Sequence, residues 1–182
     1  MSINIKRILI DVKEVLNDKS LTNIYYTHDE NIINRGYALI IGTKGTPYEY
    51  GNFFFEIYFP DNYPFSPPKV TYITNDGYTR FHPNLYINGY VCLSILNTWP
   101  GEKWSSCQSL RTILITLSSI FDNNPLLYEP AVSVNHPDIC NYNSIIKYKK
   151  YQITILKYLD IENIPENFKL FYDKIKESFI TN

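Results

Sequence analysis

One cysteine of this sequence lies in a context that suits covalent chemistry. Residues 80–96 read RFHPNLYINGYVCLSIL, so a His-Pro-Asn turn leads through a glycine-containing loop to Cys92. Asn84 precedes Cys92 by eight positions, and a loop of that length can fold back so that the Asn84 carboxamide supports the backbone beside the thiol. Such a pair would be a nucleophile with a polar helper and no adjacent base. The stretch is therefore either an active site or a buried turn, and the surrounding elements decide which.

The composition is that of a folded protein with one domain. The chain has 182 residues, of which 45% are hydrophobic and 16% aromatic, enough for a sizeable core and far from the composition of a disordered chain. The formal net charge of −1 gives no general attraction to nucleic acid or to an anionic membrane. We therefore expect neither partner.

The cysteines and the apolar runs indicate the compartment. No apolar run approaches the length of a membrane span, and the first ten residues lack the layout of a secretory signal. Cys92, Cys107 and Cys140 are an odd number of cysteines without metal-ligand spacing. They favour reduced thiols in an intracellular protein that binds no metal. We expect a cytoplasmic location, with the nucleus as a second compartment.

The first half of the chain predicts one helix followed by a sheet. Apolar residues recur at three- and four-residue intervals over residues 3–17, which indicates an amphipathic helix. β-branched and aromatic runs bounded by Gly, Asn, Asp or Pro then predict four strands joined by short turns. These strands cover 24–27, 37–41, 53–59 and 69–73. In succession they would form an antiparallel meander.

A proline-rich loop follows the third strand. Residues 59–68 read FPDNYPFSPP, and because proline has no amide donor this run cannot join the interior of a sheet. Tyr63-Pro64 is a candidate for a cis peptide bond. Phe65 either packs inward or is presented by a stiff loop to a partner. The sequence leaves these two alternatives open.

The second half predicts helices. Ser105-x-x-Gln108 has the form of a capping box, and Pro125 prevents a helix behind it from continuing. The expected helices cover 110–121, 137–160 and 168–179. The whole order is α+β: an N-terminal helix, a four-stranded antiparallel meander, an irregular active-site loop and C-terminal helices packed on one sheet layer. We expect a single domain over 1–182, with 137–182 as a C-terminal helical extension.

Several motifs in fixed order resemble the ubiquitin-conjugating enzyme (E2) family. They are Tyr63-Pro64-x-x-Pro67-Pro68, His82-Pro83-Asn84, Cys92-Leu93-x-Ile95-Leu96, Trp104, and Thr46-Pro47-Tyr48-x-x-Gly51 in an earlier turn. Each motif alone is weak, but together their order and spacing are specific, because each needs the same fold context. The resemblance covers residues 3–135 and implies the UBC-like fold.

The residues after the cysteine suggest a subgroup. Most members of the family pass from Cys-Leu-x-Ile-Leu to the tryptophan with few residues between, whereas this chain carries Leu-Ser-Ile-Leu-Asn-Thr-Trp-x-Gly-x-x-Trp over 93–104. That longer insert is similar to the large E2s, which include the giant apoptosis-inhibitor type and one that also loads other ubiquitin-like modifiers. Tyr142-Asn143 and Pro165-Glu166 in the tail also fit that subgroup.

The resemblance implies acyl transfer through a thioester on Cys92. The thiol would accept the C-terminal carbonyl of ubiquitin, or of a ubiquitin-like modifier, from an E1 activating enzyme. It would then pass this group to a lysine of a substrate protein or to a cysteine of an E3 ligase. The chain itself would need no cofactor, because ATP is consumed by the E1, and it would act as a monomer.

The resemblance also implies roles for the neighbours of Cys92. Asn84 would donate to the tetrahedral oxyanion or hold the loop that shapes the site. His82 would bond to the backbone within its turn and hold it, rather than act as a base. Where many members have an Asp that orients or deprotonates the attacking lysine, this chain has Asn124, which cannot accept a proton at neutral pH.

The resemblance also implies residues that contact partners. Phe65 and the loop with Ser105 and Ser106, where Ser-Pro-Ala is usual, are candidates for contact with an E3. A basic residue common on the first helix is replaced by Ile10. Lys6 and Arg7 are therefore the remaining candidates for E1 contact.

Two other functions are conceivable. A non-catalytic E2-like module that binds ubiquitin or a partner would lack the cysteine and usually degrade the His-Pro-Asn turn, whereas this chain keeps both. A cysteine-dependent hydrolase would need a catalytic histidine, and neither His28 nor His136 has a recognisable triad context. The sequence favours the enzyme.

Overall fold

Four strands form one antiparallel sheet in the computed structural model, which describes residues 3–181 of the chain. The strands are β1 (Ile24–His28), β2 (Arg35–Ile41), β3 (Asn52–Tyr58) and β4 (Lys69–Tyr72), paired in the order β1-β2-β3-β4. The predicted meander is confirmed, with strand ends that differ from the prediction by one or two residues. The register places Phe55 opposite both Ala38 and Tyr72.

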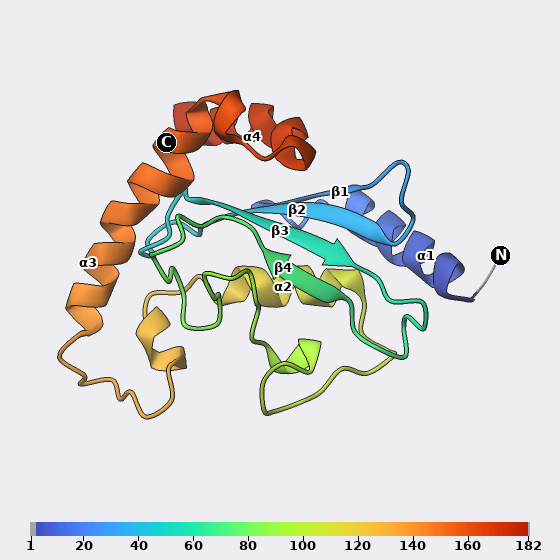
Figure 1. Cartoon of the computed structure of the whole chain (residues 1–182), viewed down its shortest axis with the longest axis horizontal. Helices are drawn as coiled ribbons and strands as arrows, with labels where there is room; N and C mark the ends of the chain where they lie inside the picture. Colours follow the sequence, from blue (N-terminus) through green and yellow to red (C-terminus); the bar gives the residue numbers. More distant parts are fainter. Residues whose placement is uncertain (1–2, 182) are drawn as a thin grey trace.

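Two helices cover one face of this sheet. Helix α1 (Ile3–Asn17) has the predicted bounds, and helix α2 (Leu110–Ser119) lies below the sheet in Figure 1. Their apolar sides meet alternate strand residues in the larger hydrophobic core, since successive strand side chains point to opposite faces. That core includes Ile8, Val12, Val15, Ala38, Ile40, Phe53, Phe55, Leu110, Ile113 and Leu117.

The C-terminal segment covers the other face, so the sheet is a middle layer with helices on both sides. Leu39 and Phe54, which point away from α1 and α2, pack against Tyr158 and Phe168 in a second hydrophobic cluster. In Figure 1 helix α3 (Ile139–Lys149) rises along the side of the sheet, and helix α4 (Tyr172–Thr181) lies above the sheet. The UBC-like α+β fold is confirmed.

The last two predicted helices, over 137–160 and 168–179, are less regular than expected. The helix expected over 137–160 continues beyond α3 as a π-helical turn (Lys150–Ile155) and a 3-10 turn (Leu156–Leu159). Asn52 at the start of β3 donates to the Thr154 carbonyl at 2.8 Å and so draws that carbonyl out of the helical ladder. After a 3-10 turn at Ile161–Asn163, the last helix begins as another over Glu166–Phe171 before α4.

The predicted cap of the long helix is wrong. Ser105 and Gln108 form a turn of their own, in which the Gln108 side-chain oxygen accepts from the Ser105 N–H at 3.0 Å. Ser109 adopts the extended N-cap conformation instead, and its N–H donates to the Thr112 hydroxyl at 3.4 Å. The helix therefore begins at Leu110, because the earlier hydrogen bonds are used within the turn.

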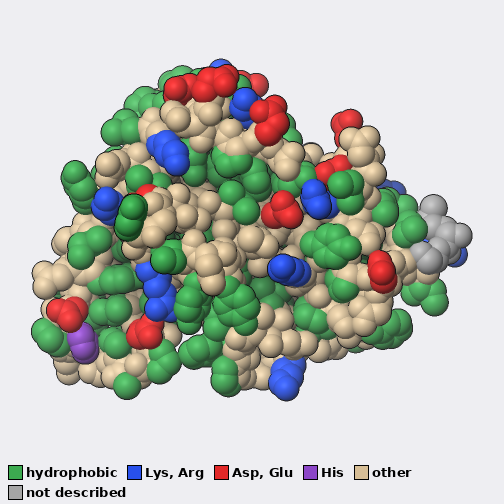
Figure 2. All heavy atoms as spheres, in the orientation of Figure 1, with side chains coloured by type: hydrophobic (Ala, Val, Ile, Leu, Met, Phe, Trp, Pro, Cys, Tyr) green, Lys and Arg blue, Asp and Glu red, His purple; other side chains and the backbone are tan. Residues whose placement is uncertain are grey.

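The surface carries charges of both signs. On the face in Figure 2, Lys, Arg, Asp and Glu side chains are interspersed, and several of each lie at the top, where the C-terminal segment is found in Figure 1. Ion pairs there include Lys169–Glu166 at 3.0 Å and Lys176–Asp173 at 3.0 Å. Over residues 3–181 no helix combines the length and apolarity needed to cross a membrane.

Candidate active site

The His-Pro-Asn turn and the cysteine loop fold back on each other as predicted. The Cys92 N–H donates to the Asn84 carbonyl at 2.9 Å, and the Asn84 carboxamide donates to the Cys92 carbonyl at 2.6 Å. Leu85 forms isolated bridges to both His82 and Val91, so the two arms of the loop lie side by side. Gly89, at a φ of 87°, turns the chain between the arms, a backbone conformation that favours glycine.

Asn84 therefore holds the loop that carries Cys92. Of the two roles left open from the sequence, support of the backbone is the one its carboxamide performs in this structure. The residue is buried, and its own backbone N–H is also bound, since it donates to the imidazole of His82 at 2.9 Å. Both the side chain and the backbone N–H of Asn84 are thus fixed within the loop.

His82 is a brace within the turn. Its ring is 0% exposed and contacts the Tyr128 ring, with 4.7 Å between the centroids. Burial lowers the pKa of His82 to about 3, and the nearby Arg80 charge acts in the same direction. A neutral imidazole with Nδ1 accepting from the backbone is confirmed as part of the turn's structure.

Thr98 is a residue of the site that the sequence did not single out. Its hydroxyl accepts from the Leu93 N–H at 2.8 Å and lies 2.8 Å from the Val91 carbonyl, so it joins the residues on either side of the cysteine. Its carbonyl accepts the Cys92 thiol hydrogen, with a sulfur–oxygen distance of 3.1 Å. The only signal in the sequence was a threonine in the turn after the predicted nucleophile.

The thiol is protonated at neutral pH. Cys92 is 5% exposed, and this burial raises its pKa above the ordinary value, while the positive charge of Arg80 acts to lower it. No His or Lys forms a hydrogen bond with Cys92 within the described part of the chain. The reactivity of the thiol must therefore come from positioning and from an activated acyl donor.

Asn124 lies in the next loop but does not touch the nucleophile. It precedes the short 3-10 turn Pro125–Tyr128, is exposed, and donates its N–H to Asp122 at 2.8 Å. Among residues 3–181, no hydrogen bond joins Asn124 to Cys92 or Asn84. The loop itself meets the site through the ring of Tyr128 on His82.

The residues expected to contact partners lie on connected loops. Phe65 is 73% exposed after the Tyr63-Pro64 peptide, which is cis as predicted, so its ring is presented outward. The Trp104 ring N–H donates to the Pro64 carbonyl at 2.7 Å and joins this loop to the one with Ser105 and Ser106, which are both exposed.

Arg7 connects these loops to the first helix. Its guanidinium donates to the Ser106 carbonyl at 2.8 Å and to Asp11 at 2.8 Å, so it is held within the molecule. Lys6 and Ile10 are exposed on the same helix. Of the two basic residues expected to contact an E1, Lys6 is thus the one at the surface, and both assignments stay predictions.

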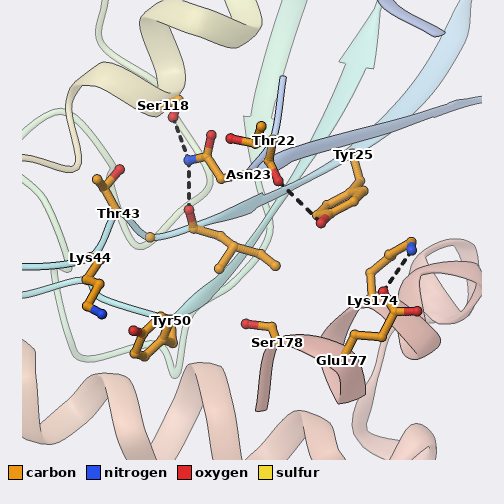
Figure 3. A pocket seen from close by; sticks show the side chains of 12 residues that line it. Thr22, Asn23, Tyr25, Thr43, Lys44, Tyr50, Ser118, Lys174, Glu177 and Ser178 are labelled. Atoms are coloured by element: carbon orange, nitrogen blue, oxygen red, sulfur yellow. Dashed lines mark hydrogen bonds and ion pairs between the residues drawn. The ribbon is translucent and has the colours of Figure 1, made fainter. Parts of the chain in front are cut away.

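The surface hollows separate into one beside the thiol and others away from it. A groove of about 410 Å³ is lined by Pro67, Thr71, Tyr90, Val91 and Thr98, so it borders the backbone next to Cys92. A larger hollow of about 520 Å³, shown in Figure 3, lies between Lys44, Tyr50 and helix α4. There the Asn23 side chain bridges Ser118 and the Ile41 carbonyl. No group of three His, Cys, Asp or Glu residues within 3–181 is arranged to hold a metal.

The α+β fold and the loop that joins Asn84 to Cys92 are those expected of a ubiquitin-conjugating enzyme. Comparison with known proteins gives the same class. The family model for ubiquitin-conjugating enzymes matches residues 7–152. The chain belongs to the ubiquitin-conjugating enzyme family. This match extends past residue 135, where the motif resemblance ended, and includes all of α3.

Curated relatives refine the placement within the family. Ubiquitin-conjugating enzyme E2 Z of Danio rerio is 40% identical over 140 residues, 75% of this chain and 43% of the relative. The human E2 Z is 43% identical over 122 residues, 65% of this chain and 34% of the relative. The human dual E2 ubiquitin-conjugating enzyme/E3 ubiquitin-protein ligase BIRC6 is 43% identical over 117 residues, 61% of this chain and 2% of the relative.

These similarities fit the large-E2 subgroup that the insert after the cysteine suggested. The chain spans less than half the length of the relatives it matches.

Proposed function

We propose that this chain is an active E2 that carries ubiquitin or a ubiquitin-like modifier as a thioester on Cys92. The observation that supports this most strongly is the hydrogen bond from the Asn84 carboxamide to the Cys92 carbonyl at 2.6 Å. It fixes a lone thiol on a rigid loop next to an open groove, in a chain that belongs to the E2 family. A non-catalytic module would have no use for that arrangement.

Loading exchanges one thioester for another. The Cys92 sulfur attacks the carbonyl carbon at the modifier's C-terminus, the new carbon–sulfur bond forms, and the bond to the E1 cysteine breaks. The proton of Cys92 goes to the departing E1 sulfur or to water. Because burial raises the pKa of Cys92, the thiolate fraction in the resting protein is small, and the acyl donor must provide the driving force.

Discharge transfers the acyl group to an amine or to a second thiol. A neutral substrate lysine attacks the carbonyl carbon, a carbon–nitrogen bond forms, the bond to Cys92 breaks, and the proton that the amine loses goes to the departing Cys92 sulfur or to water. Asn124 cannot take the ammonium proton, so the lysine must arrive neutral or lose its proton to water. Transfer to an E3 cysteine needs no such base, and we propose both acceptors.

Docking of partners would use the loops joined by Arg7 and Trp104. We assign Phe65, Ser105 and Ser106 to contact with an E3, and the exposed side of α1 with Lys6 to contact with an E1. The side-chain exposure of Phe65 and the hydrogen bond between Trp104 and Pro64 support a pre-formed surface there. ATP is used by the E1, and this chain needs no cofactor.

We also propose that the protein acts as a monomer in the cytoplasm, with the nucleus as a second compartment. Support comes from its three unpaired cysteines, two of them exposed, which suit a reducing environment.

The test is adduct formation. Incubation with E1, ATP and ubiquitin should give a reductant-sensitive adduct, and Cys92→Ser should convert it into an adduct that resists reductant, because an oxygen ester replaces the thioester. Cys107→Ser and Cys140→Ser serve as matched controls and should load normally. A panel of ubiquitin-like modifiers identifies the cargo, and absence of an adduct with every member would favour the binding module. A reducible adduct that persists in Cys92→Ser would move the nucleophile elsewhere.

A further inference from the structure

Arg80 precedes the His-Pro-Asn turn and contacts three parts of the site. Its guanidinium donates through Nη2 to the Pro83 carbonyl and lies over the Tyr86 ring, 4.2 Å from its centroid. It also pairs with Glu129, just after the 3-10 turn, at 3.6 Å. Nη2 makes both polar contacts while the planar guanidinium lies over the Tyr86 ring, and the compact ammonium group of a lysine does not reproduce that combination.

The contact with Pro83 completes the fixation of one peptide group. The Pro83–Asn84 peptide has its carbonyl bound by Arg80, and its N–H donates to His82 at 2.9 Å. With both polar atoms held, this peptide cannot rotate about its neighbouring bonds. It carries Asn84, whose carboxamide reaches the Cys92 carbonyl. Rotation of the peptide would swing that carboxamide away from the nucleophile.

We propose that Arg80 is a positioning residue of the thioester site, which fixes the peptide that carries Asn84 and ties it to Glu129. The proposal rests on the proposed function and adds to it a residue outside the His-Pro-Asn and Cys-Leu motifs. It explains why the side chain of a partly exposed arginine contacts Pro83, Tyr86 and Glu129 around this turn.

Helix α3 completes the support of Arg80. The Tyr142 hydroxyl on α3 donates to the Arg80 carbonyl at 2.9 Å, and its neighbour Asn143 donates to the Asn123 carbonyl at 3.0 Å. Helix α3 thus holds both the backbone before the His-Pro-Asn turn and the loop with Asn124.

Arg80 also affects the nucleophile through its charge. The groups that face it are Glu129, the neutral His82, and Tyr142, whose burial raises its pKa and keeps it uncharged. The charge of Arg80 opposes the rise in the pKa of Cys92 that burial causes. Glu129 offsets part of that charge. Removal of the Arg80 charge should therefore raise the pKa of the Cys92 thiol, and removal of the Glu129 charge should lower it.

The experiment uses the full chain with Cys107→Ser and Cys140→Ser, so that only Cys92 reacts with iodoacetamide. In the pH dependence of alkylation, Arg80→Gln should move the midpoint to higher pH, Glu129→Gln to lower pH, and Arg80→Lys should leave it near the parent value. In single-turnover discharge to free lysine, both Arg80 variants should be slower by roughly tenfold or more, since misplacement by about 1 Å costs up to about a hundredfold.

Arg35→Gln is the matched control. Arg35 pairs with Glu56 at 3.9 Å with similar exposure, and its Nε, like that of Arg80, is buried without a hydrogen-bond partner. Arg35→Gln should change neither the pH midpoint of alkylation nor the rate of discharge to free lysine. Thermal unfolding of each variant separates loss of fold from loss of position, and if Arg80→Gln fails to fold, Arg80→Lys and Glu129→Gln carry the test.

Two results would overturn the proposal: discharge by Arg80→Lys at the parent rate, or an alkylation midpoint that moves for none of the variants. Failure of the parent to load any modifier would instead overturn the proposed function, while the alkylation profiles would still judge the effect of Arg80 on the thiol.

Discussion

At the scale of single residues, the site is built to hold a thiol rather than to activate it. Asn84, His82 and Thr98 all bind backbone atoms within the loop or next to the cysteine. Burial raises the pKa of Cys92 and lowers that of His82. A site of this kind suits a carrier, because a thioester that is too reactive would be lost to water before it reached its acceptor.

The buried histidine should make the fold sensitive to acid. The pKa of His82 is about 3 in the folded protein and near 6.5 when unfolded, so below pH 6.5 the unfolded state binds a proton that the folded state excludes. Stability is therefore complete above pH 6.5 and is lost as the pH falls toward 3, by about 3 kcal/mol at pH 4.

Urea unfolding of the parent and of His82→Asn between pH 4 and 7 measures this loss. An Asn side-chain oxygen can accept the Asn84 N–H without titrating, so the gap in stability between the two proteins should change with pH by that amount. Comparison of the two removes the contribution of His28, whose pKa is also lowered by burial. A constant gap would contradict the assignment of His82 as a neutral brace.

At the scale of elements, Asp11 joins three segments that are distant in sequence. This carboxylate on α1 is 2% exposed, pairs with Arg7, and accepts from the Tyr63 hydroxyl of the proline-rich loop and from the Leu110 N–H at the start of α2. The loops proposed for partner contact thus depend on one buried acid for their placement.

Asp11→Ala should destabilise the fold by about 3 kcal/mol, because it leaves the Tyr63 hydroxyl and the Leu110 N–H without their acceptor and the partly buried Arg7 without its ion-pair partner. Chemical denaturation measures the change. Asp173→Ala, which removes a carboxylate that is 84% exposed and paired with Lys176, is the control and should have little effect. Equal losses in the two variants would show that the buried network does not hold these elements together.

Much at this scale could be predicted from the sequence. The bounds of α1 follow from apolar periodicity, and the four strands, to within one or two residues, follow from β-branched and aromatic runs bounded by turn residues. The fold-back of Asn84 on Cys92 follows from an eight-residue spacing with a glycine in it. The capping box at Ser105 was wrong because Gln108 bonds within its own turn. The role of Thr98 could not be predicted, since its hydrogen bonds depend on how the loop after Cys92 folds over.

At the scale of the whole molecule, the sheet has both faces covered. The cover of the second face could not be derived from the strands alone, because Leu39 and Phe54 read as ordinary strand residues whichever way they point. Phe168 links the C-terminal segment to strands that lie more than 100 residues earlier in the chain. The centroid of its ring lies 5.3 Å from that of Tyr37 and 4.8 Å from that of Phe54.

Phe168→Ala should destabilise the protein by about 3 kcal/mol, as expected for a phenyl ring that is 2% exposed. Leu170→Ala, two residues away and 57% exposed, is the matched control and should be close to neutral. Denaturation curves of both variants measure the difference. If the two losses match, the C-terminal segment contributes little to the stability of the sheet.

The hydrogen bond from the Cys92 thiol to the Thr98 carbonyl has a consequence for the carrier cycle. A thioester sulfur bears no hydrogen, so a loaded protein cannot make this hydrogen bond. The Thr98 carbonyl would then accept a hydrogen bond from water or from the cargo instead. The occupied and empty carriers therefore differ in their hydrogen bonding at the turn after the cysteine.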